Sequence, residues 1–231
     1  YALALLANAS PSDKTHVRQK QAADILEPLD QAYPEHPGVP HYLIHAYDNA
    51  ELAPKGLRAA RAYSEIAPSA PHALHMPSHI FTRVGAWADS AATNRRAATV
   101  AEKSNEPDQA LHAMDYMTYA YLQLARDDDA GKVLGKALTI DANLPAATGP
   151  YALAAMPARY ALERGAWAEA AKLAPSPSKY PYTEAMTHFA RALGERARSG
   201  LPAAASLAAM CRLIDSTVIL RARPSRTGCP T

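Results

Sequence analysis

A short block of sequence recurs along the chain and constrains the fold more than any other feature. The block GAWAD at residues 85–89 returns 80 residues later as GAWAE at residues 165–169, and ARDDDA at residues 125–130 stands midway between them. Pro34 and Pro68 each close an apolar segment and stand 34 residues apart. Recurrence at such a period is typical of a helical-repeat array, because each hairpin of helices can bury its apolar stripe only against its neighbours.

The composition favours an all-α fold. Alanine is abundant, β-branched runs are few, and the 231 residues include only 10 glycines. The 19 prolines are then expected at helix ends, because proline interrupts a helix. We expect helices at residues 1–9, 16–33, 40–50, 54–66, 71–84, 87–103, 107–125, 128–140, 151–164, 167–173, 182–198 and 202–220. From residue 221 on, apolar periodicity is lost, and we expect a disordered tail.

The repeated units resemble the tetratricopeptide repeat. Glycine followed two residues later by an aromatic residue marks the turn, small alanines stand where helices cross, and proline ends the unit. The resemblance is carried by Gly85, Trp87, Ala91 and Ala97 in one unit, by Gly165, Trp167 and Ala170 in another, and by Ala130, Leu134 and Ala137 between them. It covers about residues 15–200, and the His-rich segments also resemble those of uncharacterised bacterial repeat proteins.

The resemblance implies a right-handed α-solenoid of stacked helix–turn–helix units. The first helix of each unit would then line a concave groove, where repeats of this kind contact their ligands. We predict a single solenoid over residues 1–220, with units at about residues 1–36, 37–70, 71–106, 107–145, 146–178 and 179–220.

The histidines are concentrated in the N-terminal half of the chain. Seven of the nine lie between residues 36 and 112. His41 and His45 form a pair that returns 34 residues later as His75 and His79. Each pair has the spacing i, i+4, so both rings project from one face if the segment is helical.

Aligning the first helices of the units places polar side chains in rows along the groove. The rows are His41, His75 and Asp115; His45, His79, Tyr119 and Arg159; His72 and His112 one turn earlier; and Asp48 and Thr82 one turn later. We predict metal ligands at His41, His45, His75, His79 and Asp115. We predict ligand-binding residues at His72, His112, Asp48, Tyr119, Arg83 and Arg159.

A transition metal is the sharpest hypothesis for this cluster. Two imidazoles at i, i+4 can chelate one ion, and a neighbouring helix can supply further ligands. Zn, Cu, Ni and Fe all suit imidazole together with a carboxylate. The cluster holds more ligands than one tetrahedral site uses, so either two ions bind or some histidines support the ligands or carry protons. The alternative is that the rings are packing residues bonded to carbonyls and tyrosine hydroxyls.

Two features of the paired histidines limit the metal hypothesis. Neither HYLIH nor HMPSH has a glutamate after its first histidine, so the general base of the zincins is absent. Pro77 lies between His75 and His79, where it can break the helix and abolish the chelate. The sequence leaves this second point open.

The sequence is consistent with three functions. The first is a scaffold whose groove binds a transition metal or a small polar ligand. The second is a protein-interaction adaptor that binds a peptide in the groove, the common use of such solenoids by fold analogy. The third is a metal-dependent enzyme, hydrolytic or oxidative, in which the metal polarises substrate or activates water.

Charge and hydropathy exclude other classes of function. The net charge of +2, with Lys and Arg scattered, gives no argument for nucleic-acid binding. No run approaches 18 apolar residues, so we expect a soluble chain with no membrane partner.

Cys211 and Cys229 form no CxxC motif and do not support a zinc finger. The chain starts at Tyr1 without a basic leader, which we interpret as a missing N-terminal portion of a longer chain; the compartment stays open between cytoplasm and periplasm.

Overall fold

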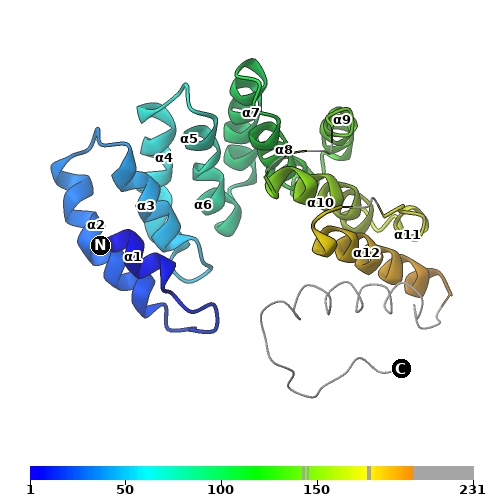
Figure 1. The fold of residues 1–231 in the computed structure, drawn as a ribbon, viewed down its shortest axis with the longest axis horizontal. Helices are drawn as coiled ribbons and strands as arrows, with labels where there is room; N and C mark the ends of the chain where they lie inside the picture. The colour runs from blue at the N-terminus through cyan, green and yellow to red at the C-terminus, as the bar shows by residue number, and fades with distance from the viewer. Residues whose placement is uncertain (142–143, 145, 176–177, 200–231) are drawn as a thin grey trace. The chain divides into compact units, whose positions relative to one another are not determined.

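A computed structural model describes residues 1–141, 144, 146–175 and 178–199 of the chain. All regular secondary structure in these residues is helical, and no strand occurs among them (Figure 1). The all-α prediction is therefore confirmed. None of the helices described is long and apolar enough to cross a membrane. The helix predicted for residues 202–220, the tail from residue 221 and both cysteines lie outside the described residues.

The chain divides into two compact units, one up to Ala120 and one from Tyr121 on. The helices of the first unit are α1 (Ala2–Ala7), α2 (Val17–Ala32), α3 (Gly38–Tyr47), the 3-10 helix η1 (Ala53–Gly56), α4 (Leu57–Ile66), α5 (Pro71–His75), α6 (Pro77–Arg83), α7 (Trp87–Lys103) and α8 (Pro107–Gln123), the last of which crosses the boundary. The second unit holds α9 (Asp127–Ala137), α10 (Thr148–Glu163), α11 (Trp167–Ala170) and α12 (Pro181–Ser199).

Helices that follow one another in the first unit also pack on one another. Helix α2 packs on α1 and α3, α3 on α4, and α4 on α5 and α6, which in turn pack on α7 (Figure 1). In the second unit α10 packs on α9, α11 and α12. Among the described residues each predicted segment contains a helix, with shifts at the ends. Two segments are not single α-helices: 71–84 divides into α5 and α6, and 54–66 begins with η1. The prediction of one continuous solenoid remains a prediction.

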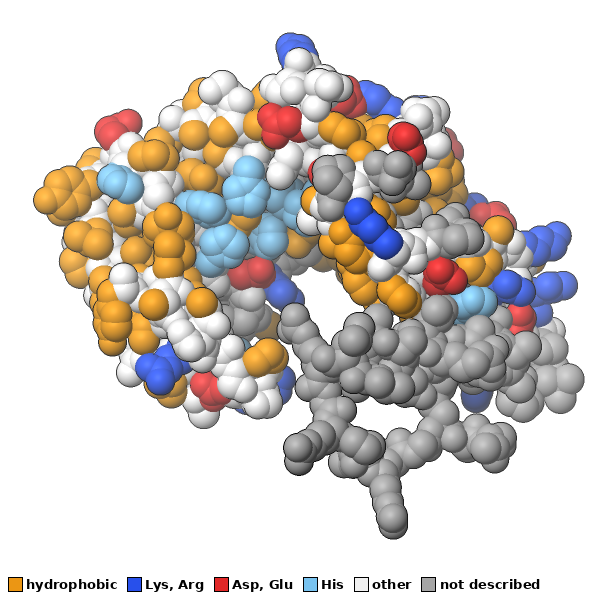
Figure 2. All heavy atoms as spheres, viewed as in Figure 1, with side chains coloured by type: hydrophobic (Ala, Val, Ile, Leu, Met, Phe, Trp, Pro, Cys, Tyr) orange, Lys and Arg blue, Asp and Glu red, His pale blue; other side chains and the backbone are white. Residues whose placement is uncertain are grey.

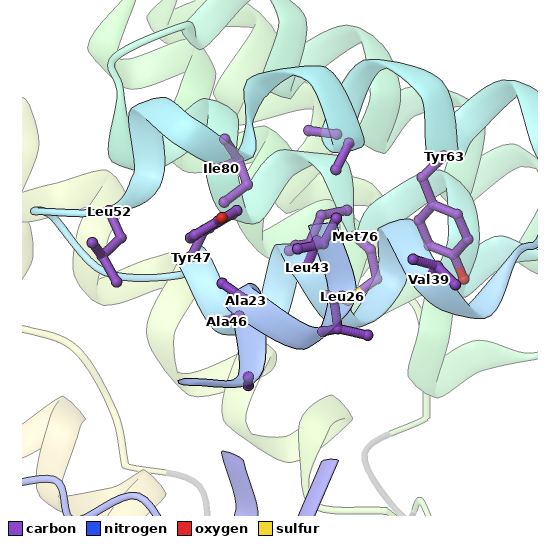
Figure 3. Packing of buried hydrophobic residues seen from close by; sticks show 14 of the residues in the cluster. Ala23, Leu26, Val39, Leu43, Ala46, Tyr47, Leu52, Tyr63, Met76 and Ile80 are labelled. Atoms are coloured by element: carbon purple, nitrogen blue, oxygen red, sulfur yellow. The ribbon is translucent and has the colours of Figure 1, made fainter. Parts of the chain in front are cut away.

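The core of the first unit is a row of large side chains separated by small ones. Leu43 and Tyr47 of α3 lie among Leu26, Met76 and Ile80, and each is at most 4% exposed (Figure 3). Fully buried alanines complete the contacts of these helices; they are Ala22, Ala46, Ala53 and Ala60. Because alanine has only a methyl group, helices that meet at alanines can approach closely, and the first helices are held at fixed positions.

One type of turn recurs where helices end. Gly85 has φ +75°, and its N–H donates to the Thr82 carbonyl at 3.4 Å. The N–H of Ala86 donates to the Phe81 carbonyl at 2.8 Å. This pair of bonds is the Schellman motif, which needs a left-handed residue at its centre. Ala125 (φ 53°) and Gly165 (φ 64°) make the same pair of bonds. The three positions that recur in the sequence therefore share one backbone conformation.

The turn at Ala125 should be less stable than the turns at Gly85 and Gly165. A left-handed conformation costs a residue with a side chain about 1–2 kcal/mol, and glycine avoids this cost. Part of the advantage is cancelled, because glycine makes the unfolded chain more flexible. We expect Ala125→Gly to raise the free energy of unfolding, and Gly85→Ala to lower it, by about 0.5–1 kcal/mol each. A methyl group at Gly85 would meet only the Trp87 ring at 3.9 Å, so the backbone alone decides the effect.

Chemical denaturation of the two variants measures both effects. The matched control is Ala92→Gly, an exposed alanine inside α7, which should lose about 1 kcal/mol because its conformation is helical. A loss of stability in Ala125→Gly like that of the control would contradict the assigned turn.

Candidate metal centre

Six histidines from α3, α5, α6 and α8 gather on one face of the first unit. Helix α3 carries His41 and His45, α5 carries His72 and His75, α6 carries His79, and α8 carries His112. Figure 2 shows histidine side chains forming one continuous patch on the face in view. The rings divide into two groups of three, in each of which one nitrogen per ring lies within 4.8 Å of the other two.

The first group consists of His41, His45 and His72, and we call it the outer triad. The Nε2 atom of His41 lies 3.1 Å from Nε2 of His45 and 3.2 Å from Nε2 of His72. His45 is exposed, and neither His41 nor His72 is buried. The outer triad is therefore an i, i+4 pair of α3 completed by a histidine of α5.

The second group consists of His75, His79 and His112, and we call it the inner triad. The Nε2 atoms of His75 and His79 lie 3.1 Å apart, and the His112 ring centre is 4.2 Å from that of His75. His75 is only 1% exposed, and the other two rings are partly buried. The inner triad repeats the outer one: an i, i+4 pair is again completed by a histidine of a later helix, here α8.

Pro77 interrupts the helix without disturbing the inner triad. It separates α5 from α6, because proline has no N–H with which to continue the hydrogen-bond ladder. Met76, which lies between the two helices, keeps right-handed helical angles of φ −52° and ψ −38°. The His75 and His79 rings therefore still meet as they would on an unbroken helix. The question that the sequence left open is resolved in favour of the pair.

The inner triad is held from behind through the Nδ1 atoms of two rings. His75 Nδ1 lies 2.7 Å from Oδ1 of Asn94, a buried residue of α7 whose amide nitrogen donates to the Ser90 carbonyl at 2.8 Å. His79 Nδ1 lies 2.9 Å from Oδ2 of Asp48. Both partners present an acceptor, so Nδ1 of each ring carries the proton.

Asp48 is held as a carboxylate. Its second oxygen, Oδ1, accepts a hydrogen bond from Arg83 Nε at 2.8 Å. Burial on its own raises the pKa of Asp48, but its hydrogen bonds with His79 and Arg83 and the positive charge of Arg83 outweigh it and bring the pKa to about 2. A carboxylate behind a histidine that faces a metal fixes the ring and strengthens its donor nitrogen.

These hydrogen bonds leave two lone pairs facing each other. With Nδ1 of each ring directed at an acceptor, Nε2 of His75 and Nε2 of His79 face each other 3.1 Å apart. Either one ring takes up a further proton, or a cation lies between them. Two nitrogens bound to one tetrahedral zinc at 2.0–2.1 Å are themselves about 3.3 Å apart. The observed spacing is thus close to that of two ligands of one ion.

The outer triad poses a similar hydrogen-bonding problem. Nε2 of His41 lies within hydrogen-bond distance of Nε2 in both other rings, yet a nitrogen with one hydrogen can donate to only one of them. A single ion bound by all three nitrogens would satisfy the three rings at once. The donor set is chemically suitable, since neutral imidazole is the commonest protein ligand of transition metals.

The electrostatic environment keeps most of these rings neutral. Burial, followed by the neighbouring histidines, lowers the pKa of His41 and that of His112 to about 4. The same causes lower the pKa of His75 well below its usual value. Near pH 7 these nitrogens therefore keep their lone pairs, and protons compete weakly with a metal for them.

Tyrosine rings surround both triads. Tyr63 and Tyr42 stack on His41, with ring centres 5.3 and 5.4 Å away. Tyr116 contacts all three rings of the inner triad, at 4.8 Å from His75, 5.1 Å from His79 and 5.6 Å from His112. These aromatic contacts limit the orientations that the imidazoles can adopt.

The structure brings some of the predicted site residues together in the triads and places others outside them. His72 and His112, predicted to bind ligand, complete the triads, while Asp115, predicted to bind metal, is 1% exposed and belongs to neither triad. Tyr119 packs on Trp87 with ring centres 5.5 Å apart. Arg159 belongs to the second unit, where Nη2 donates to the Tyr151 hydroxyl at 3.5 Å.

The residue that sequence reasoning missed is Asn94. It lies on α7, which carries none of the predicted site residues, and no sequence pattern marks it. Comparisons of the chain with protein-family models, with curated proteins and with solved structures found no match. The assignment of these side chains therefore rests on their geometry.

Proposed function

We propose that this chain is a metal-binding helical-repeat protein that holds one transition-metal ion in each histidine triad. The observation that supports it best is the pair of Nε2 atoms of His75 and His79, 3.1 Å apart, with Nδ1 of each ring bonded to an acceptor. An ion between the two Nε2 atoms would satisfy both of them without a further proton on either ring. Two triads, each an i, i+4 pair joined by a third histidine, also account for six histidines, which exceed the needs of one ion.

The scaffold that we propose is a right-handed solenoid of tetratricopeptide-like units. The recurrent Schellman turns at Gly85, Ala125 and Gly165 support it, as does the packing of consecutive helices in the first unit. In such an array the first helices repeat at a regular offset, so the same ligand geometry can occur twice. The two triads are the consequence: each combines the paired histidines of one first helix with the single histidine of another.

The ligand set favours borderline metals over hard ones. All six ligands are neutral imidazoles, which suit Zn, Cu, Ni and Fe, whereas Mg and Ca prefer oxygen donors. Three protein ligands leave a fourth tetrahedral position open on each ion, and a small polar ligand or water can occupy it.

Metal analysis of protein prepared without a histidine tag tests the proposal. After loading with Zn and removal of free ions, the wild type should retain two ions per chain. His45→Ala removes an exposed ligand of the outer triad, and His112→Ala removes a ligand of the inner triad, so each variant should retain one ion. The matched control is His36→Ala, an exposed histidine outside both triads, which should retain two. Failure of the wild type to bind Zn, Cu, Ni or Fe would refute the proposal.

A further inference from the structure

We propose that the two triads act in sequence: the outer triad captures an ion from solution and passes it to the inner triad, which retains it. This inference rests on the proposed metal-binding function and adds a direction to it. It depends on two observations, the unequal construction of the triads and the unbroken series of imidazole rings between them.

The triads differ in exposure. His45 is exposed, and neither His41 nor His72 is buried, so an ion can reach the outer triad directly from solvent. In the inner triad His75 is 1% exposed and the side chain of His79 is 16% exposed. Solvent access therefore favours the outer triad as the first point of contact.

The triads also differ in how firmly their rings are held. In the inner triad His75 is fixed by Asn94, and His79 is fixed by Asp48, which Arg83 holds in turn. The outer rings are oriented mainly by stacking, as with Tyr63 on His41. A ring that is already oriented loses less conformational entropy on binding, and a supporting carboxylate commonly raises metal affinity by about 10–100-fold. Affinity therefore favours the inner triad as the final site.

A continuous series of rings joins the two triads. The ring centres of His41 and His72 are 5.0 Å apart, those of His72 and His75 are 6.5 Å apart, and those of His75 and His79 are 5.0 Å apart. His72 and His75 belong to different triads but lie one turn apart on α5. An ion bound to Nε2 lies about 3 Å from the centre of its ring, so the two ions would be within about 13 Å of each other.

The transfer is a ligand exchange without oxidation or reduction. One metal–nitrogen bond to the outer triad breaks as one to the inner triad forms, until His75, His79 and His112 hold the ion. Any proton shared between the Nε2 atoms of His75 and His79 is released to water as the ion takes its place. The vacated outer triad is then free to capture a second ion.

A protection experiment measures the transfer. The protein receives one equivalent of Zn, and after a variable delay a brief pulse of excess chelator removes the accessible ions, leaving those in the inner triad. The wild type should gain protected Zn about tenfold faster than His45→Ala, because transfer from a neighbouring site is intramolecular. The protected amount at long times should be the same in both proteins, since His45 is not an inner ligand.

Two further variants make the outcome decisive. His36→Ala should load at the wild-type rate, and His112→Ala should bind Zn that never becomes protected. Equal loading rates for the wild type and His45→Ala would overturn the transfer, even though both bind metal. Protected Zn in His112→Ala would overturn the assignment of the inner triad as the retaining site. Absence of Zn binding in the wild type would instead refute the proposed function itself.

Discussion

Asp48→Asn is expected to weaken binding at the inner triad by about 10–100-fold and to leave the outer triad unchanged. The variant keeps the size of the side chain and removes its negative charge. In the wild type, the Asp48 carboxylate accepts hydrogen bonds from both His79 Nδ1 and Arg83 Nε. An amide oxygen can still accept one of these bonds, but the amide nitrogen can only donate. One of the two partners is therefore left without an acceptor, and His79 loses its fixed tautomer.

The affinity of the inner triad can be measured without interference from the outer one. In a His45→Ala background the outer triad is incomplete, so competition with a chromophoric Zn chelator reports the inner site. The matched control is Asp128→Asn, which neutralises an exposed carboxylate at the start of α9 and should not change the affinity. Equal affinity in the presence and absence of the Asp48 charge would show that His79 does not bind the ion through Nε2.

The metal-free protein is expected to lose stability as the pH falls from 7 to 5. His41 and His112 have pKa values of about 4 in the folded chain, lowered first by burial and then by neighbouring histidines, against about 6.5 when unfolded. Over this interval the unfolded chain binds protons that the folded chain does not bind. The free energy of unfolding therefore decreases as the pH is lowered. Both rings are partly exposed, and after allowance for solvent screening we expect a loss of about 1–2 kcal/mol.

Urea denaturation at pH 7 and pH 5, in the presence of a chelator, measures this loss. His112→Gln replaces one titrating ring by a neutral polar side chain and should show a shallower pH dependence than the wild type. His36→Ala alters an exposed histidine outside the triads and should keep the full dependence. A stability that rises toward pH 5 would mean that the rings are protonated in the folded chain, which contradicts neutral ligands.

The sequence predicted the helices well, because the residues that start and end a helix lie at its own ends. Residues 87–103, bounded by the glycine turn and by a lysine, coincide with α7. The segment 54–66 is less regular than predicted, since its first turn is the 3-10 helix η1. The segment 40–50 ends early at Tyr47, where the chain turns and the Asn49 side chain accepts a hydrogen bond from the Leu52 N–H at 2.9 Å. Such a turn depends on one side chain and leaves no periodic signal.

The site was predictable only in part. Helical spacing alone placed His41 with His45, and His75 with His79, on common faces. The completion of each triad depends on how far one helix is shifted along its neighbour, which the alignment of units does not contain. For this reason His112 meets His75, whereas Asp115, in the same row as His75, lies in neither triad. The support from Asn94 depends on packing between two helices and could not be read from either one.

X-ray absorption at the zinc edge tests the central claim most directly. On wild-type protein loaded with two ions, we expect a first shell of imidazole nitrogens at about 2.0–2.1 Å, three per ion on average, with one further ligand such as a water oxygen completing each. His45→Ala loaded with one ion should keep this signature, because the inner triad is intact. A first shell dominated by carboxylate oxygens, or one imidazole per ion, would contradict the two histidine triads as metal sites.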